Sequence, residues 1–178
     1  GTGAIGFSIA KKIIKEGYTP ILISRNEEEL VNKSKEINCE YEICDVLEQD
    51  QIDQISNKHA DTINGLAYCV GSINLKPLKI TKDTDFIESF KINTLGAINV
   101  IKSNTESLAK NNGSILLFST IAVQQGFTNH SVVSSSKGAI EGLTMSLAAE
   151  FAPKIRINCI APSLTDSKMS QKMVSNEN

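Results

Sequence analysis

Segments with helical and strand-like patterns alternate along this chain, and that alternation restricts its fold more than any other feature. The helix-like segments cover about residues 6–16, 26–36, 48–58, 81–110 and 131–151. The strand-like segments are short and rich in Ile, Leu and Val, and they cover residues 20–24, 40–44, 65–70, 113–119 and 155–161. The helical segments are long enough to connect parallel strands. The pattern therefore predicts an α/β fold, with helices on both faces of a parallel sheet.

Composition and charge exclude several classes of protein. The 178 residues, 40% of them apolar and 21% charged, have an ordinary balance for one globular domain. The net charge is −2 without a basic block, so nucleic acid is a poor candidate partner. No apolar run approaches the roughly 18 residues of a membrane span, and no charged-then-apolar leader opens the chain. We expect one domain over residues 1–178, soluble and cytoplasmic.

The four cysteines show no close CxxC pair, and three of them lie in apolar stretches. They are Cys39, Cys44, Cys69 and Cys159. This distribution favours buried reduced thiols over a zinc site or disulfides.

The chain opens on a glycine-rich turn, GTGAIG, that leads directly into the first helical segment. Gly1, Gly3 and Gly6 let the backbone approach a ligand, and the N–H groups and dipole of the following helix favour a pyrophosphate. A plain structural turn is the alternative interpretation. Such a turn normally follows a central strand, which is absent here, and residues 162–178 show no later strand. We therefore expect a Rossmann-type doubly wound parallel sheet, truncated at both ends.

Ser24 and Arg25 follow the strand-like run ILIS about 20 residues after the glycine turn. In dinucleotide-binding folds an acidic residue at this point holds the ribose 2′-hydroxyl, whereas an arginine accommodates a 2′-phosphate. The sequence thus predicts NADP as the cofactor, with NAD as the alternative. A solvated loop charge is the competing interpretation of Arg25.

Two further residues follow strand-like runs. Asp45 comes after EYEIC, and ligands of parallel sheets bind beyond the carboxyl ends of the strands, so Asp45 is a candidate for contact with the adenine. A cap of the next helix is an equal alternative for this side chain. Gly71 ends YCVG and indicates a close approach of the backbone to the dinucleotide, although a plain turn glycine is nearly as good an interpretation.

With these motifs placed, the chain resembles the short-chain dehydrogenase/reductase family over nearly its whole length. GTGAIG is similar to the family's glycine motif, with the first glycine missing ahead of Gly1 and Ala4 at a usual glycine position. Asp45-Val46 is similar to the adenine-contacting Asp-Val pair, and PSLT at residues 162–165 to the loop that holds the nicotinamide carboxamide. The cofactor-binding residues that the resemblance implies are Gly1, Gly3, Gly6, Ser24, Arg25, Asp45, Val46, Gly71, Lys137, Pro162 and Thr165.

The chain departs from the family at the active site. The family's Ser, Tyr and Lys fall at positions 120, 133 and 137, which here are Thr120, Val133 and Lys137. Thr120 keeps a hydroxyl and Lys137 is intact, but valine has no proton to donate. Asn93, in NTLG, matches the asparagine that holds a water in the family's proton relay. The resemblance therefore implies Asn93, Thr120 and Lys137 as catalytic residues, with a rate lowered about 10²- to 10⁴-fold by the missing acid.

Other side chains near the predicted site are weaker candidates for the missing proton donor. Tyr68, where the family usually has asparagine, is more often a packing residue, and His130 is more often a surface residue. The hydroxyl run of residues 131 and 134–136 is expected to supply a helix N-cap and solvent contacts.

The leading hypothesis is an oxidoreductase that moves hydride between NADP(H) and a small carbonyl or alcohol. The alternative, motivated by Val133, is a nucleotide-binding redox sensor or partner subunit without turnover. A scaffold that has lost the nucleotide is a third hypothesis. The resemblance also implies a homodimer or homotetramer, because helices near residues 86–110 and 131–151 pair across subunits in this family.

Overall fold

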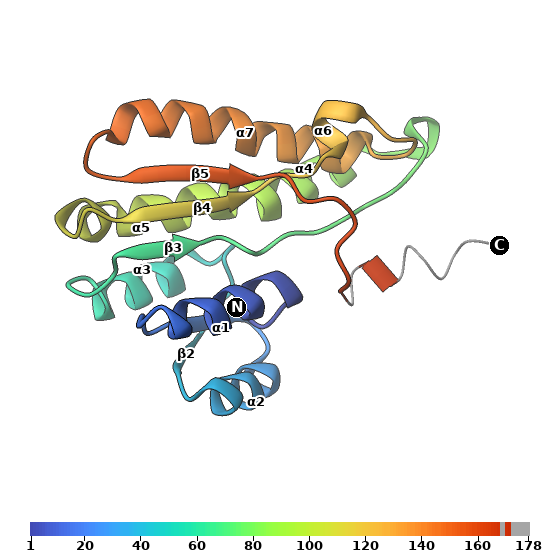
Figure 1. Cartoon of the computed structure of the whole chain (residues 1–178). Helices are drawn as coiled ribbons and strands as arrows, with labels where there is room; N and C mark the ends of the chain where they lie inside the picture. Colours follow the sequence, from blue (N-terminus) through green and yellow to red (C-terminus); the bar gives the residue numbers. More distant parts are fainter. Residues whose placement is uncertain (168–169, 172–178) are drawn as a thin grey trace.

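The computed structural model describes residues 1–167 and 170–171, and it confirms the α/β class (Figure 1). The strands are β1 (Ile21–Ser24), β2 (Glu40–Ile43), β3 (Gly65–Ala67), β4 (Ser114–Phe118) and β5 (Arg156–Ile160). The α-helices are α1 (Ala4–Lys15), α2 (Glu27–Ile37), α3 (Gln49–Lys58), α4 (Asp83–Phe90), α5 (Gly96–Lys110), α6 (Ala122–Gln125) and α7 (Ser131–Phe151). The short η1 (Leu78–Ile80) is a 3₁₀ turn, and η2 (Lys91–Leu95) is a π-helical turn.

All strand pairs are parallel, but the sheet is divided into two parts. β1 pairs with β2, and β3, β4 and β5 form a second sheet in that order. The break lies between β1 and β3, where the usual order of this fold places its first strand. The amino group of Gly1 lies beside β1 and donates a hydrogen bond to the Ile23 carbonyl.

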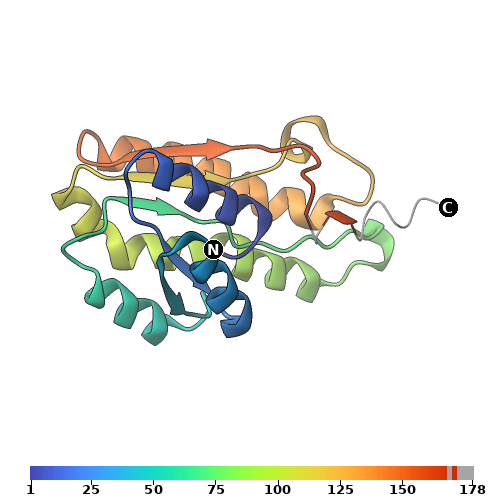
Figure 2. The same ribbon diagram turned by 60° about the horizontal axis from the view of Figure 1, so that its bottom comes forward.

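The larger core lies on one face of the three-stranded sheet. In β4 the alternate residues Ile115 and Leu117 are fully buried, and they pack in one cluster with Ile101 of α5 and Ile140 of α7. α5 and α7 therefore cover the same face, as Figures 1 and 2 show. On β5 the outward Ile160 remains 49% exposed, so the opposite face is only partly covered by the described residues.

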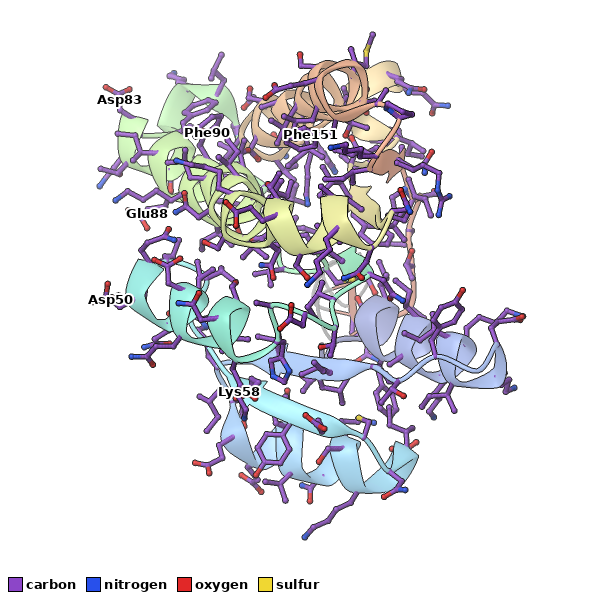
Figure 3. The ribbon with its side chains drawn as sticks, turned by 90° about the vertical axis from the view of Figure 1, so that its left-hand side faces the viewer. Asp50, Lys58, Asp83, Glu88, Phe90 and Phe151 are labelled. Carbon is purple, nitrogen blue, oxygen red and sulfur yellow. The ribbon has the colours of Figure 1, made fainter. Side chains whose placement is uncertain are left out.

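The smaller sheet has helices on both sides. In Figure 3, α2 and α3 lie on opposite sides of β1 and β2. A second core cluster joins α1, β1 and α2 through Phe7, Ala10, Leu22 and Leu30. Within the described residues, no helix is long and apolar enough to cross a membrane.

The predicted helix over residues 81–110 is interrupted. α4 and α5 are separated by the π-helical turn η2, and Asn93 and Thr94 lie buried within that turn. Below it, the Tyr68 hydroxyl donates a hydrogen bond to the Ile92 carbonyl at 2.6 Å. The spacing of apolar residues could not predict this π-helical turn, because the helices before and after it show the same helical spacing. Such turns are frequent at functional sites.

Candidate active site

The glycine turn leaves the start of α1 open. Gly3 is the N-cap of α1, and among the described residues no side chain caps it and no acidic residue occupies the first turn. A Cβ at Gly3 would meet nothing within 4 Å, whereas a Cβ at Gly6 would lie 3.3 Å from the Cβ of Cys69. Gly6 thus allows α1 to approach the segment after β3, and the exposed N–H groups at Gly3 suit an anionic phosphate.

Arg25 and Asp45, predicted separately as cofactor contacts, lie next to each other. Arg25 Nη1 is 3.3 Å from Asp45 Oδ2, and the Arg25 side chain is 70% exposed. Asp45 Oδ1 also accepts the Leu47 N–H, but the N-cap of α3 is Glu48, so the helix-cap alternative for Asp45 is wrong. An exposed pair of this kind contributes at most about 1 kcal/mol. A phosphate could therefore compete for Arg25 at little cost.

The neighbours of this pair differ in exposure. Ser24 Oγ lies at the end of β1 and accepts the Asn26 N–H at 3.4 Å. Val46 is buried and packs in the larger core cluster. Ser24 thus lies at the same end of β1 as Arg25, while the Val46 side chain contributes to the core.

Gly71 is the point at which two predicted site residues converge. A Cβ added at Gly71 would lie 2.8 Å from Asn93 Oδ1 and 3.4 Å from Lys137 Nζ. Asn93 comes from η2 and Lys137 from α7, so the tertiary fold brings both side chains to the backbone that follows β3. A side chain at position 71 would clash with Asn93 Oδ1, whereas its distance from Lys137 Nζ would be an ordinary contact.

Asn93 is fully buried, and both the oxygen and the nitrogen of its side-chain amide form hydrogen bonds. Its Oδ1 accepts the Ser72 N–H at 3.2 Å, and its Nδ2 donates to the Ser89 carbonyl at 2.9 Å. The Ser89 hydroxyl lies 2.9 Å from the Ser136 hydroxyl of α7. This serine network links α4, η2 and α7. A buried polar network that is satisfied in this way holds its members in one geometry.

Lys137 lies half-buried one helical turn after position 133. Its Nζ donates to the Phe118 carbonyl at the end of β4, at 2.9 Å. Burial lowers the pKa of Lys137 to about 8, and the nearby Cys159 and Cys69 thiols oppose this shift. Burial also raises the pKa of Cys69, to about 11. The lysine is therefore mostly protonated at pH 7 but loses its proton at a lower pH than an ordinary lysine, whereas the thiol stays protonated.

The remaining candidate site residues lie on α7, in the turn after β4 and in the loop after β5. Val133 is 3% exposed on α7. Thr120 follows β4, and its Oγ1 accepts the Ala122 N–H at 3.3 Å. Pro162 lies beside this turn because its carbonyl accepts the Ile121 N–H, while Thr165 is exposed on the next loop. The loop after β5 and the turn after β4 are thus joined by one backbone bond.

Sequence reasoning missed the contact that joins this turn to α7. The Ser119 hydroxyl donates to Glu141 Oε1 at 2.5 Å and lies 3.4 Å from the Lys137 carbonyl. Glu141 is one helical turn after Lys137, so its spacing alone would have placed it on the same face.

The substitutes for a tyrosine at 133 have other roles. Tyr68 is a buried core residue, as expected, and His130 is partly exposed in the loop before α7. The serine run does not supply the N-cap, because His130 occupies that position. Ser134 and Ser135 donate to backbone carbonyls, and Ser136 is buried in the network with Ser89. Helix α7 already begins at Ser131, so the serines lie inside the helix. Their hydroxyls bond to carbonyls of α7 and α6 or to Ser89 of α4.

The four cysteines are free thiols. Cys44 is buried and the others are partly buried. Burial raises the pKa of all four thiols, which keeps them protonated near neutral pH.

A parallel α/β sheet with an open glycine turn, cationic and acidic residues at the carboxyl strand ends and a buried lysine defines a Rossmann-type dinucleotide-binding protein. The family model for short chain dehydrogenases matches residues 1–178. This chain belongs to the short chain dehydrogenase family.

Curated relatives agree with this assignment. The 3-oxoacyl-[acyl-carrier-protein] reductase of Mus musculus is 29% identical over 180 residues, covering 97% of this chain and 76% of that protein. Dehydrogenase/reductase SDR family member 6 of Aquarana catesbeiana is 32% identical over 170 residues, covering 94% of this chain and 69% of that protein.

Solved structures are equally similar. ElxO with NADP bound superposes with a TM-score of 0.89 at 29% identity, covering 98% of this chain and 75% of that one. A variant of ElxO in which one tyrosine is replaced by phenylalanine, with NADPH bound, has a TM-score of 0.90. The chain thus spans about three quarters of the length of these structures.

Proposed function

We propose that this protein is an NADP(H)-dependent oxidoreductase that acts on a small carbonyl or secondary alcohol. The observation that carries the proposal is the convergence of Asn93 and Lys137 on Gly71, in the segment after β3 that the glycine turn contacts through Gly6 and Cys69. These residues fit a dinucleotide, because the cradle at Gly71 has no room for a side chain and the first turn of α1 offers free N–H groups. The NADP and NADPH complexes of the 29% identical ElxO support the choice of cofactor.

In this proposal the chain's own residues bind and orient the two reactants. When bound, NADPH supplies a hydride. Arg25 reads the 2′-phosphate, Lys137 holds the ribose hydroxyls, and Thr120 orients the substrate oxygen. Asn93, fixed by Ser72 and Ser89, holds a water near Lys137 for proton exchange.

A second candidate function is nucleotide binding without turnover, as in a redox sensor or partner subunit. The observation that favours it is Val133, an apolar buried side chain at the position of the family's proton donor. The ElxO variant with phenylalanine in place of one tyrosine has NADPH bound. This supports the idea that a related chain can bind the nucleotide without that tyrosine hydroxyl. Both candidate functions predict tight nucleotide binding. Only the oxidoreductase predicts turnover of a substrate, so a turnover assay distinguishes them.

Cofactor titration tests the proposal and its NADP preference together. Quenching or enhancement of NADPH and NADH fluorescence should show wild-type protein binding NADPH at least about 10-fold more tightly, because Arg25 adds a charge-assisted contact. Arg25→Asp is expected to reverse that preference. Lys12→Asp, another exposed cation, is the matched control and should keep it. Equal binding of both nucleotides by wild-type protein would contradict the role of Arg25, and no binding of either would contradict the proposal.

We also propose that the chain forms a homodimer or homotetramer through the side built from α4, α5 and α7. These helices lie together, away from α1 and α2 (Figure 3). The exposed apolar side chains of these helices include Ile87, Phe90 and Met145, at 51, 39 and 76% exposure, and Leu95 of the turn η2 is 41% exposed. Such residues favour burial against another surface.

Light scattering after gel filtration checks this assembly. Wild-type protein is expected to elute as a dimer or larger, and Met145→Asp combined with Ile87→Asp should shift it to monomer, because buried unpaired carboxylates are costly. Tyr18→Asp, at an exposed aromatic that follows α1, is the control and should leave the mass unchanged. A wild-type monomer would overturn the assembly.

A further inference from the structure

Carbonyl reduction requires a proton as well as a hydride. The hydride adds to the carbonyl carbon, the electron pair of the C=O π bond moves to oxygen, and that oxygen must take a proton. Val133 has none to give. The proton has to come from another group on the same side of the fold.

Most neighbouring donors are unsuitable. Burial raises the pKa of Tyr68 far above neutral, and its hydroxyl is engaged with the Ile92 carbonyl. Burial likewise raises the pKa of Cys69 to about 11. His130 Nδ1 lies 2.8 Å from the Thr128 carbonyl, which can only accept, so this nitrogen carries the ring's hydrogen. Among the described residues, the His130 ring contacts Thr128 and Phe127, and it lies outside the group formed by Gly71, Asn93 and Lys137.

Building on the proposed oxidoreductase function, we propose that Lys137 itself donates the proton to the substrate oxygen, in place of the hydroxyl that position 133 lacks. Lys137 lies one helical turn from Val133 and therefore shares its face of α7. Its Nζ is within 3.4 Å of the Gly71 Cβ position and uses one hydrogen for the Phe118 carbonyl. An ammonium group has three, so two remain for the ribose and the substrate.

The titratable groups that face Lys137 are two thiols, and the amino group of Gly1 lies near one of them, Cys69. Cys159 comes from β5 and Cys69 from the segment after β3, and both thiols are protonated near neutral pH. Glu141, on the same helix, accepts the Ser119 hydroxyl instead. Asn93 and Ser89 are neutral. Among the described residues, no carboxylate forms an ion pair with Lys137, so little opposes loss of its proton.

The ionisation of Lys137 agrees with this role. Its pKa of about 8 leaves mostly ammonium at pH 7, yet the neutral amine is accessible once the proton has moved. In the step, an N–H bond of Lys137 breaks, an O–H bond of the alcohol forms, and the amine takes a proton back from water. Reduction should thus slow as pH rises through about 8, while alcohol oxidation, which needs the free amine, should accelerate over the same range.

Lysine labelling measures the ionisation without any cofactor or turnover. Wild-type protein is labelled briefly with acetic anhydride between pH 6 and 10, and each lysine is followed by peptide mass spectrometry. We expect Lys137 to reach half of its maximal labelling near pH 8. Lys58, whose pKa is raised by its hydrogen bond to Glu42, is the internal control and should remain poorly labelled at pH 9.

Kinetics of Lys137→Arg then tests donation itself. Arginine keeps the positive charge but not an acidic proton, so the Kd for NADPH should stay within about 3-fold while kcat for diketone reduction falls by about 10²-fold or more. Retention of wild-type kcat by Lys137→Arg, or a wild-type kcat that is constant up to pH 10, would overturn the proposal. Activity only after Val133→Tyr would also overturn it while leaving the cofactor assignment intact. Absence of NADPH binding in wild-type protein would instead defeat the oxidoreductase function.

Discussion

Val133→Tyr is expected to raise kcat for carbonyl reduction by about 10²-fold or more. The substitution adds a phenolic proton one helical turn before Lys137, and a positioned acid typically contributes about 10² to 10⁴ in rate. The neighbouring ammonium lowers the pKa of such a phenol by favouring its charged form. Loss of NADPH absorbance with a small diketone measures the change, and the thermal midpoint records any effect on folding.

Val133→Phe is the matched control for this substitution. Val133 is 3% exposed, so either ring costs about 1–3 kcal/mol of stability through overpacking. Only tyrosine adds a proton. An equal rise in kcat for both variants would assign the effect to packing, and no rise for Val133→Tyr would show that position 133 does not limit the reaction.

Gly71→Ala should abolish most of the activity and weaken NADPH binding. The new Cβ would lie 2.8 Å from Asn93 Oδ1, closer than real Cβ atoms approach, and Asn93 cannot move freely because Ser72 and Ser89 hold its amide. Displacing it also disturbs Lys137, whose Nζ is 3.4 Å from the same point. We expect kcat/KM to fall by about 10²-fold or more, since a 1 Å misplacement of an active-site group can cost that much.

Gly65→Ala separates this effect from a general cost of replacing glycine. Gly65 also belongs to the β3 region, and a Cβ there would meet nothing within 4 Å. Steady-state kinetics and cofactor fluorescence of both variants give the comparison. Equal activity of Gly71→Ala and Gly65→Ala would contradict the proposed convergence of Asn93 and Lys137 on Gly71.

Much of the fold follows from sequence pattern. Helix α7, Ser131–Phe151, begins and ends where helical periodicity predicted, and the strands fall within their predicted ranges. The π-helical turn at η2 could not be predicted, because one wider turn leaves the apolar spacing on either side unchanged.

The contact between Arg25 and Asp45 depends on the tertiary structure. Sequence pattern placed Arg25 and Asp45 at the ends of two strands. The parallel pairing of β1 with β2 sets Ser24 opposite Ile43. Because of this register, Arg25 and Asp45 lie at the same edge of the sheet and form an ion pair. The roles of these residues remain proposals that the Arg25→Asp titration tests.

The sequence alone determined the α/β class, the family resemblance and the absence of a proton at position 133, because these depend on residue type and spacing. Tertiary structure decided which groups meet. Lys137 donates a hydrogen bond to the Phe118 carbonyl and faces Cys69, from the segment after β3, and Cys159 of β5. Its pKa of about 8 depends on burial among these distant segments, and no local pattern records burial of that kind.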